Sequence, residues 1–371
     1  MSQSLPPGAT IGIVGGGQLG RMLAMAAARL GYRTAILEPD RACPAAQVAN
    51  LHIVADYEDS RGLEQLANAC DVITYEFENV PVTTARSLAD RNTVYPPAEA
   101  LEAAQDRLSE KIFFNTMGLA TAPFTTVENG RDLAEGLARF GGNGILKTRR
   151  MGYDGKGQKI FRGATAQDVQ EAAAEMGGVP LILEGLIPFE REISVIAARG
   201  LDGALAAYDP AENMHRNGIL ARSRVPAAVS AATAEAAREA AFAVLTALDY
   251  VGVVGIEFFV LDNGSILVNE MAPRVHNSGH WTEAACAVSQ FEQHIRAITG
   301  LPLGDTGRHS DCVMENLLGP EQDRAPELLG EPGVVLHLYG KTEARLGRKM
   351  GHFTRLFPLS GRKQPVTGSG R

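Results

Sequence analysis

Two glutamates on either side of a predicted β-turn are spaced so that they could bind a metal ion. The β-prone runs 255–260 and 265–270 flank Asn263-Gly264, the strongest short signal for a two-residue hairpin turn. In the register that such a turn sets, Glu257 lies directly opposite Glu270. Carboxylates that face each other across an antiparallel pair repel, so a partner must offset their charge.

A divalent cation is the partner that this pair favours. Hard cations such as Mg²⁺ take oxygen ligands, commonly one or two carboxylates together with substrate phosphates. With Asn269 beside Glu270, the hairpin predicts the floor of a binding site for magnesium and a nucleotide. The alternative is two solvated glutamates on an edge strand. The same register pairs Val260 with Leu267.

The composition of the whole chain limits the class of protein that carries this hairpin. Its 371 residues suggest two or three domains, and 45% hydrophobic with 21% charged residues is typical of soluble globular proteins. The net charge of −8 provides no dominant basic surface, which argues against nucleic acid as a partner. The N-terminus lacks the pattern of a signal peptide, and no apolar stretch approaches membrane-spanning length. We therefore expect a cytoplasmic protein with no membrane partner, whose four cysteines, without metal-ligand spacing, are reduced.

The first part of the chain alternates strands and helices, which predicts a parallel sheet covered by helices. Gly15-x-Gly17-x-x-Gly20, with Glu38 at the end of the next strand, matches the dinucleotide-binding fingerprint. The exposed N–H groups of such a turn would equally bind another phosphate, and a purely structural tight turn is a further alternative. The expected strands are 11–14, 33–37, 52–55, 71–75 and 93–95.

A second, smaller unit carries a glycine-rich loop. The run 144–147 predicts a buried strand that ends in Lys147. In the loop 151–158, glycines let the backbone approach an anion and Lys156 adds charge, which favours a cover for phosphates. A plain surface turn and a strand-end lysine that extends into solvent are the alternatives.

The rest of the chain predicts a larger sheet with two long helices. Strand 192–197 leads toward the hairpin, and helices are expected at 227–248 and 281–299, the second stopped by Gly300. The segment 269–280 holds one arginine and two histidines without zinc spacing, which favours an anion pocket beside the carboxylates. A strand at 333–339 precedes the basic residues Lys341, Arg345, Arg348 and Lys349.

Six motifs follow one another along nearly the whole chain. They lie at 15–22, 75–81, 147–150, 152–158, 269–280 and 346–352. In type and order they resemble the ATP-grasp ligases, and within them the 5-(carboxyamino)imidazole ribonucleotide synthetases of purine biosynthesis. The resemblance implies a mixed α/β and α+β fold, an ATP-grasp with an N-terminal Rossmann-like parallel-sheet domain and a small C-terminal β-rich region. The domains would be 1–108 (Rossmann-like, pre-ATP-grasp), 109–187 (small ATP-grasp lid) and 188–371 (large ATP-grasp and C-terminal domain).

The resemblance also implies a reaction. ATP held between two sheets phosphorylates bicarbonate to carboxyphosphate, which carboxylates the exocyclic amine of 5-aminoimidazole ribonucleotide. The chain would then be a carbon–nitrogen ligase and a homodimer, with ATP and Mg²⁺ as cofactors and bicarbonate and the ribonucleotide as substrates.

Each predicted role can be carried over to individual residues. Glu257 and Glu270 would hold magnesium, Glu184 to Ile187 would line the adenine site, and Asp154 would orient the amine. Arg274 and His276 would bind bicarbonate and carboxyphosphate. The ATP-binding residues would be Arg107, Lys147, Gly152, Tyr153, Asp154, Gly155, Lys156, Gly157, Gln158, Glu184, Gly185, Leu186, Ile187, Glu192, His215, Asn269 and Glu270. The ribonucleotide would meet Gln18, Leu19, Glu76, Tyr153, Asp154, Lys341, Arg348 and Lys349, and the catalytic residues would be Asp154, Arg274, His276 and Lys341.

Three other functions fit parts of the sequence. The N-terminal glycines fit a nicotinamide oxidoreductase, and the ATP motifs fit another ATP-grasp ligase or a silent nucleotide-binding protein. One departure from the resemblance is Met151, which stands where the loop often opens with another glycine. Because a Cβ disfavours positive φ, we expect this loop to close differently.

Overall fold

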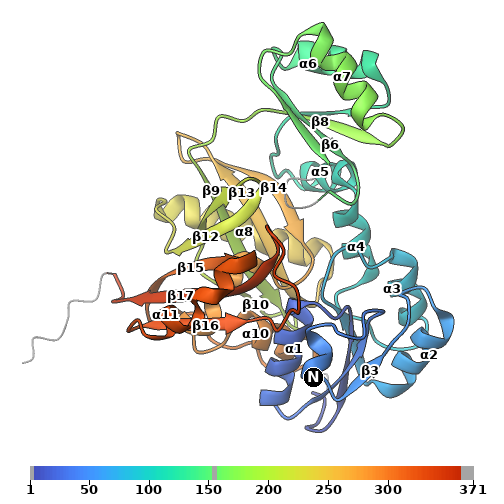
Figure 1. Ribbon diagram of the computed structural model, residues 1–371, viewed down its shortest axis with the longest axis vertical. Helices are drawn as coiled ribbons and strands as arrows, with labels where there is room; N and C mark the ends of the chain where they lie inside the picture. Colours follow the sequence, from blue (N-terminus) through green and yellow to red (C-terminus); the bar gives the residue numbers. More distant parts are fainter. Residues whose placement is uncertain (1–3, 153–156, 361–371) are drawn as a thin grey trace, which may run out of the picture.

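Three β-sheets organise the chain in the computed structural model, which describes residues 4–152 and 157–360 (Figure 1). They belong to an N-terminal domain (10–105), a small lobe (124–185) and a central domain (191–357). The small lobe stands apart at the top of the view, while the other two parts lie against each other below it. Within the described ranges, no helix is long and apolar enough to cross a membrane.

The N-terminal domain is a four-stranded parallel sheet in the order β3-β2-β1-β4. This confirms the predicted parallel sheet, except that 93–95 contributes only a single bridge, between Val94 and Ile73. Its strands are β1 Thr10–Val14, β2 Arg33–Leu37, β3 Leu51–Ile53 and β4 Val72–Tyr75. Its helices are α1 Gln18–Arg29, η1 Ala45–Gln47, α2 Ser60–Ala69, α3 Val82–Ala89 and α4 Ala98–Gln105.

The small lobe is an antiparallel sheet in the order β5-β8-β6-β7 with two helices. It has its own apolar core, in which Leu133, Leu137, Leu146 and Leu183 are buried. The lobe follows α5 (Arg107–Thr116), whose N-cap Asp106 accepts hydrogen bonds from the first-turn amides. Its elements are β5 Phe124–Val127, α6 Gly130–Arg139, β6 Gly144–Thr148, β7 Gln158–Phe161, α7 Ala166–Met176 and β8 Leu181–Gly185.

The central domain is a nine-stranded sheet in the order β14-β13-β9-β11-β12-β15-β17-β16, with β10 paired to β9. The C-terminal strands therefore extend the same sheet that contains the Asn-Gly hairpin. Its strands are β9 Arg191–Arg199, β10 Leu205–Ala207, β11 Ala211–Arg216, β12 Ile219–Val225, β13 Gly252–Val260, β14 Ile266–Ala272, β15 Asp311–Leu318, β16 Val334–Leu338 and β17 Lys349–Phe357. Its helices are α8 Ala231–Ala247, η2 Asn277–Gly279, α9 Thr282–Ala285, α10 Gln290–Ile298, η3 Gly319–Arg324 and α11 Ala325–Leu329.

Two sequence predictions are wrong in detail. The helix expected at 281–299 is broken, because Cys286 is extended and Ser289 caps a new helix, α10, through its side chain. The hairpin turn is one residue longer than predicted. The N–H of Leu261 donates to the carbonyl of Ser265 (2.9 Å), and Val260 consequently pairs with Ile266 instead of Leu267.

Candidate active site

A cleft of about 1570 Å³ opens between the small lobe, the central sheet and the glycine turn of the N-terminal domain. It brings together every predicted site residue in the described ranges except Gly157. The predicted residues that line it are Gln18, Leu19, Glu76, Arg107, Lys147, Gly152, Gln158, Glu184, Gly185, Leu186, Ile187, Glu192, His215, Glu257, Asn269, Glu270, Arg274, His276, Lys341, Arg348 and Lys349. The predicted Tyr153, Asp154, Gly155 and Lys156 lie outside the described residues.

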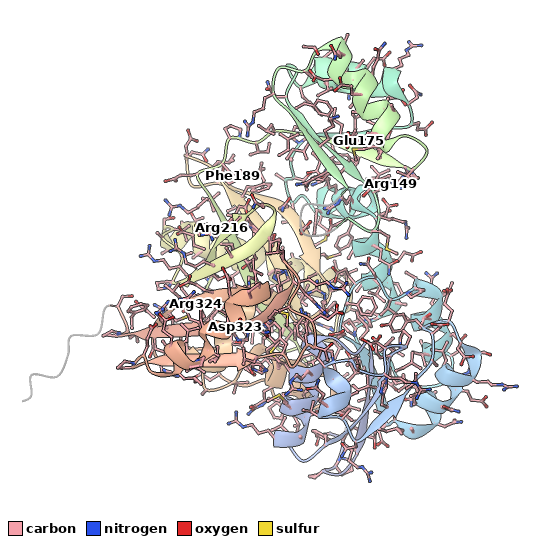
Figure 2. All side chains as sticks on the ribbon, in the orientation of Figure 1. Arg149, Glu175, Phe189, Arg216, Asp323 and Arg324 are labelled. Carbon is pink, nitrogen blue, oxygen red and sulfur yellow. The ribbon has the colours of Figure 1, made fainter. Side chains whose placement is uncertain are left out.

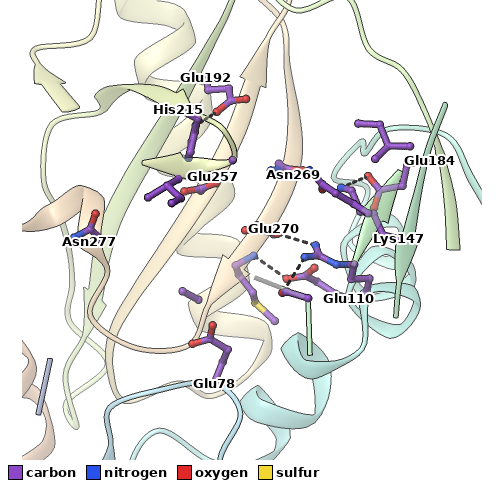
Figure 3. Close-up of a pocket in the computed structure, with 18 of the residues that line it drawn as sticks. Glu78, Glu110, Lys147, Glu184, Glu192, His215, Glu257, Asn269, Glu270 and Asn277 are labelled. Carbon is purple, nitrogen blue, oxygen red and sulfur yellow. Dashed lines mark hydrogen bonds and ion pairs between the residues drawn. The ribbon is translucent and has the colours of Figure 1, made fainter. Parts of the chain in front are cut away.

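The two hairpin glutamates face each other at the floor of this cleft (Figure 3). A β-bulge brings them into register: Phe258 pairs with Val268, Asn269 is the extra residue, and Glu257 then pairs with Glu270. The bulge compensates for the longer turn, so the predicted facing pair is confirmed although the predicted turn is not. Burial, and then the charge of Glu270, raise the pKa of Glu257.

Arg107 lies on the other side of Glu270. Its Nη1 is 2.8 Å from Glu270 Oε2. Burial opposes ionisation of Glu270, but the charges of Arg107 and Lys147 outweigh it and lower the pKa of this carboxyl. Behind the pair, Glu110 of α5 accepts a hydrogen bond from the N–H of Met271 at 2.7 Å. Burial and then Glu270 raise the pKa of Glu110 to about 8, so the floor carries less negative charge than three ionised carboxylates would.

The small lobe contributes a buried lysine–glutamate pair opposite this floor (Figure 3). Lys147 at the end of β6 is 3.1 Å from Glu184 at the end of β8. Lys111 of α5 is 3.3 Å from the same Glu184 oxygen and is fully buried. Burial lowers the pKa of Lys147 although Glu184 acts against it. The other Glu184 oxygen, Oε1, is buried without a hydrogen-bond partner among the described residues.

Two stacked phenylalanines and a glutamate–histidine pair line the far end of the cleft. Phe189 stacks on Phe259 with ring centroids 4.6 Å apart. Figure 2 shows Phe189 on the side of the central domain that faces the small lobe. Glu192 Oε2 lies 2.6 Å from His215 Nδ1. Burial would lower the pKa of His215, but the hydrogen bond to Glu192 outweighs it and raises that pKa.

The N-terminal glycine turn is filled by side chains of the protein itself. The Glu76 carboxylate accepts hydrogen bonds from the N–H groups of Gly17 (2.5 Å) and Gly20 (2.7 Å). Glu38 accepts from the N–H of Gly16 at 2.9 Å. Two carboxylates thus occupy amides that would hold a pyrophosphate in a dinucleotide site, which argues against the nicotinamide alternative.

A second ion pair lies where the turn meets the central domain. Arg274 Nε is paired with Glu78, which follows β4. Burial works against ionisation of Glu78, but Arg274 outweighs it and lowers the pKa of that carboxyl. Burial, followed by the charges of Arg274 and Lys349, lowers the pKa of His276 to about 3, so its imidazole is neutral near pH 7. The His276 Nδ1 is 2.8 Å from the hydroxyl of Ser278.

Several residues of the cleft were not predicted from the sequence. Glu78, Glu110 and Phe189 line it, and Lys111 supports it from α5. Glu78 lies in the motif 75–81, so that motif was a usable signal for it. Glu110 and Lys111 lie on a helix whose sequence looks like an ordinary charged helix, and only the fold shows that they are buried.

Met151 adopts the conformation that its side chain disfavours. Its φ is 61°, and the side chain is exposed and lines the cleft. The residue therefore adopts a left-handed backbone conformation, which glycine takes without strain, at a conformational cost of roughly 1–2 kcal/mol.

A nucleotide-sized cleft between a small antiparallel sheet and the carboxylate hairpin of a larger sheet defines an ATP-grasp enzyme. Residues 112–291 match the ATP-grasp domain family. Residues 8–105 match the ribonucleotide synthetase preATP-grasp domain, and residues 312–359 match the phosphoribosylaminoimidazole carboxylase C-terminal domain.

Comparison with similar proteins identifies the family within the ATP-grasp enzymes. An N5-carboxyaminoimidazole ribonucleotide synthase of Brucella melitensis is 62% identical over 355 residues, which covers 96% of this chain and 98% of that protein. The ADP complex of the Staphylococcus aureus synthetase has a TM-score of 0.90 at 39% identity and covers 95% of this chain and 94% of that one. The Aspergillus clavatus synthase in complex with ADP and 5-aminoimidazole ribonucleotide has a TM-score of 0.88 at 31% identity, with coverages of 95% and 94%. The chain belongs to the N5-carboxyaminoimidazole ribonucleotide synthase family.

Proposed function

We propose that this enzyme carboxylates the amine of 5-aminoimidazole ribonucleotide, using ATP and bicarbonate, in purine biosynthesis. The observation that carries the proposal is the facing of Glu257 and Glu270 beneath Lys147 in a cleft large enough for a nucleotide. Membership of the synthase family supports the same reaction. We also propose a homodimer, as the family resemblance implies, and a cytoplasmic location.

The residues of the floor fit a magnesium ion. Glu257 and Glu270 provide oxygen ligands that face each other, and the raised pKa of Glu257 reflects burial and a repulsion that a cation would relieve. Asn269 lies at the bulge between them and adds an amide oxygen. When bound with ATP, magnesium would neutralise charge on the nucleotide phosphates.

The chain's own cationic groups would position the triphosphate. Arg107 and Lys147 reach the cleft from α5 and from β6 of the small lobe, on either side of the floor. Leu186 and Ile187 in the connection to β9 would contact adenine, and the Glu192–His215 pair would bind the ribose side. Phosphoryl transfer depends mainly on such positioning and charge stabilisation.

The carboxylation step would take place at the other end of the cleft. A bicarbonate oxygen attacks the γ-phosphorus, ADP leaves, and the amine then attacks the carbon of carboxyphosphate with loss of phosphate and a proton. Arg274, oriented by Glu78, would bind the anionic reactants, and neutral His276 would offer them a hydrogen bond. The amides of Gln18 and Leu19, together with Lys341, Arg348 and Lys349, would bind the ribonucleotide phosphate. Glu76 and the predicted Tyr153 and Asp154 would face the imidazole, with Asp154 orienting the amine.

Dependence of ADP release on the two other substrates tests this function. We expect the full rate only when bicarbonate and 5-aminoimidazole ribonucleotide are both present, with carboxylated ribonucleotide formed in step with ADP. Robust turnover with formate or an amino acid would assign the chain to another ligase class. Tight binding of NADH, followed by its fluorescence, would instead revive the oxidoreductase alternative.

Replacing one floor carboxylate tests the magnesium role. We expect Glu270→Gln to lose most activity, because the amide binds Mg-ATP more weakly. The fold should survive, because the lost ion pair with Arg107 is partly offset by relief of the repulsion between Glu257 and Glu270. ATP affinity measured over a range of magnesium concentrations gives the result. The matched control is Glu171→Gln, an exposed glutamate of the small lobe, which should match the wild type. Unchanged kinetics in Glu270→Gln would exclude the proposed role.

A further inference from the structure

Three potential metal ligands converge outside the cleft, between α9 and the β16–β17 hairpin. They are Glu283, His337 and His352, whose ligand atoms all lie within 4.8 Å of one another. His337 and His352 are direct partners across the antiparallel pair, and their rings stack with centroids 5.4 Å apart. None of the three lines the nucleotide cleft. The sheet register therefore holds two imidazoles side by side in front of one carboxylate.

The distances suit a small four-coordinate cation. Glu283 Oε2 is 3.2 Å from His337 Nδ1 and 3.6 Å from His352 Nε2. A tetrahedral zinc ion with bonds of about 2.0–2.1 Å separates its ligand atoms by roughly 3.3 Å, close to both values. The 3.6 Å between Glu283 Oε2 and His352 Nε2 is longer than a hydrogen bond, so no direct hydrogen bond holds these two side chains together.

The surroundings orient the buried imidazole for ligation. His352 Nδ1 is 2.9 Å from the hydroxyl of Tyr339, which leaves Nε2 as the atom near the carboxylate. Histidine ligands are commonly held in this way through their other ring nitrogen. His280 packs against His352 with centroids 4.6 Å apart, and its Nε2 is buried without a partner among the described residues.

We propose that Glu283, His337 and His352 bind a divalent transition-metal ion, with zinc as the best fit and a solvent molecule at the fourth position. Two histidines and one carboxylate are nitrogen and oxygen ligands of the kind that zinc prefers, and they differ from the all-oxygen floor that fits magnesium. The ion would join α9 to β16 and β17. Because β17 begins with Lys349, which lines the cleft, the site would fix the wall that carries a predicted substrate contact.

Metal binding to the intact chain tests the proposal. After treatment with a chelator, the protein is titrated with Zn²⁺ against a chromophoric competitor and, separately, with Co²⁺ while visible spectra are recorded. We expect one tight zinc ion per chain and the intense cobalt bands of a four-coordinate site. Weak zinc binding, or only the faint bands of six-coordinate cobalt, would overturn the proposal.

Substitutions at the proposed ligands test whether the ion binds to Glu283, His337 and His352. We expect Glu283→Gln and His337→Gln to abolish the intense cobalt bands, and Tyr339→Phe to weaken zinc binding by about 10–100-fold through loss of the orienting hydroxyl. Tyr250→Phe is the matched control, because it removes another buried hydroxyl, bonded to the Val253 carbonyl, in a separate apolar core. Glu270→Gln should also retain zinc affinity. Equal zinc affinity in all variants, or its loss in Glu270→Gln alone, would place the ion elsewhere.

Discussion

The small lobe and the N-terminal domain both meet the central domain, but through different chemistry. Apolar residues of α1 and β1, such as Leu23 and Ile11, belong to the same buried cluster as Trp281 and Ile295 of the central domain. The small lobe has a separate core made only of its own side chains. Its links to α5 are polar: Arg149 and Arg150 pair with Asp106, and Glu184 pairs with Lys111.

This difference indicates which wall of the cleft can move. A shared apolar core resists displacement, because separating it exposes buried surface to water. Polar contacts near a hinge can be exchanged for solvent at a smaller cost. We therefore expect the N-terminal domain and the central domain to form a rigid base, and the small lobe to close on ATP and shield carboxyphosphate from water.

Replacing one buried leucine by alanine in each of the two cores should change stability the most. Leu23→Ala and Leu133→Ala each remove a fully buried leucine, at a cost of about 2–5 kcal/mol. We expect Leu23→Ala to lower the main denaturation midpoint, because its cluster joins two domains. Leu133→Ala should instead produce an early transition confined to the small lobe. Hydrogen exchange, resolved by peptide during denaturation, separates the two outcomes.

Identical behaviour of Leu23→Ala and Leu133→Ala would contradict the proposed independence of the small lobe. A single transition shifted equally by both replacements would show that the small lobe unfolds together with the base. Early exchange limited to β5–β8 in the Leu133→Ala protein would support independent behaviour.

Removing one charge at the hinge should have a smaller effect. Asp106 caps α5 and accepts from Arg149 at 2.9 and 2.8 Å. Asn is as good an N-cap as Asp, so Asp106→Asn removes the ion pairs and keeps the cap. We expect a loss of about 1–3 kcal/mol and faster exchange in the small lobe. A higher KM for ATP should accompany it, because closure is weakened.

The pH dependence of that variant checks the cause. Burial raises the pKa of Asp106, but the hydrogen bond and charge of Arg149 outweigh it, so the folded-state pKa lies below its usual value. The stabilisation is therefore complete above an unfolded pKa of about 3.9 and disappears as the pH falls through the lower folded pKa. The stability difference between the wild type and Asp106→Asn should shrink in that acid range. A difference independent of pH would show that the charge is not responsible.

The sequence predicted the sheets and the position of most of the cleft residues, because strand periodicity, glycine turns and motif order are local signals. The hairpin shows the limit of such counting. Its turn holds one more residue than Asn263-Gly264 indicates, and the bulge at Asn269 restores the pairing of Glu257 with Glu270. Two local irregularities cancel, and neither has a clear signal in the side chains.

The sequence alone could not show which charged side chains are buried, for a different reason. Glu110, Lys111 and Asp106 are nearly inaccessible, yet the first two occupy, and the third caps, a short helix with mixed polar residues. Their burial depends on β14 and β8, which lie far along the chain and cover α5 in the fold. The roles of Glu110 and Lys111 therefore required tertiary structure, whereas Lys147 was marked by its place at a strand end.

The smallest effect is expected at Met151, which lies on the small-lobe side of the cleft. Met151→Gly relieves a left-handed conformation that costs a residue with a Cβ roughly 1 kcal/mol or more, while the added freedom of the unfolded chain returns part of that gain. We expect a net stabilisation below about 1 kcal/mol, limited to the small lobe, together with a changed rate of lobe closure. Asn217→Gly is the control, since Asn217 is exposed at φ 53° and asparagine tolerates this region. An equal gain in both variants would mean that glycine acts generally, and a gain in the base rather than in the lobe would contradict the independence of the two parts.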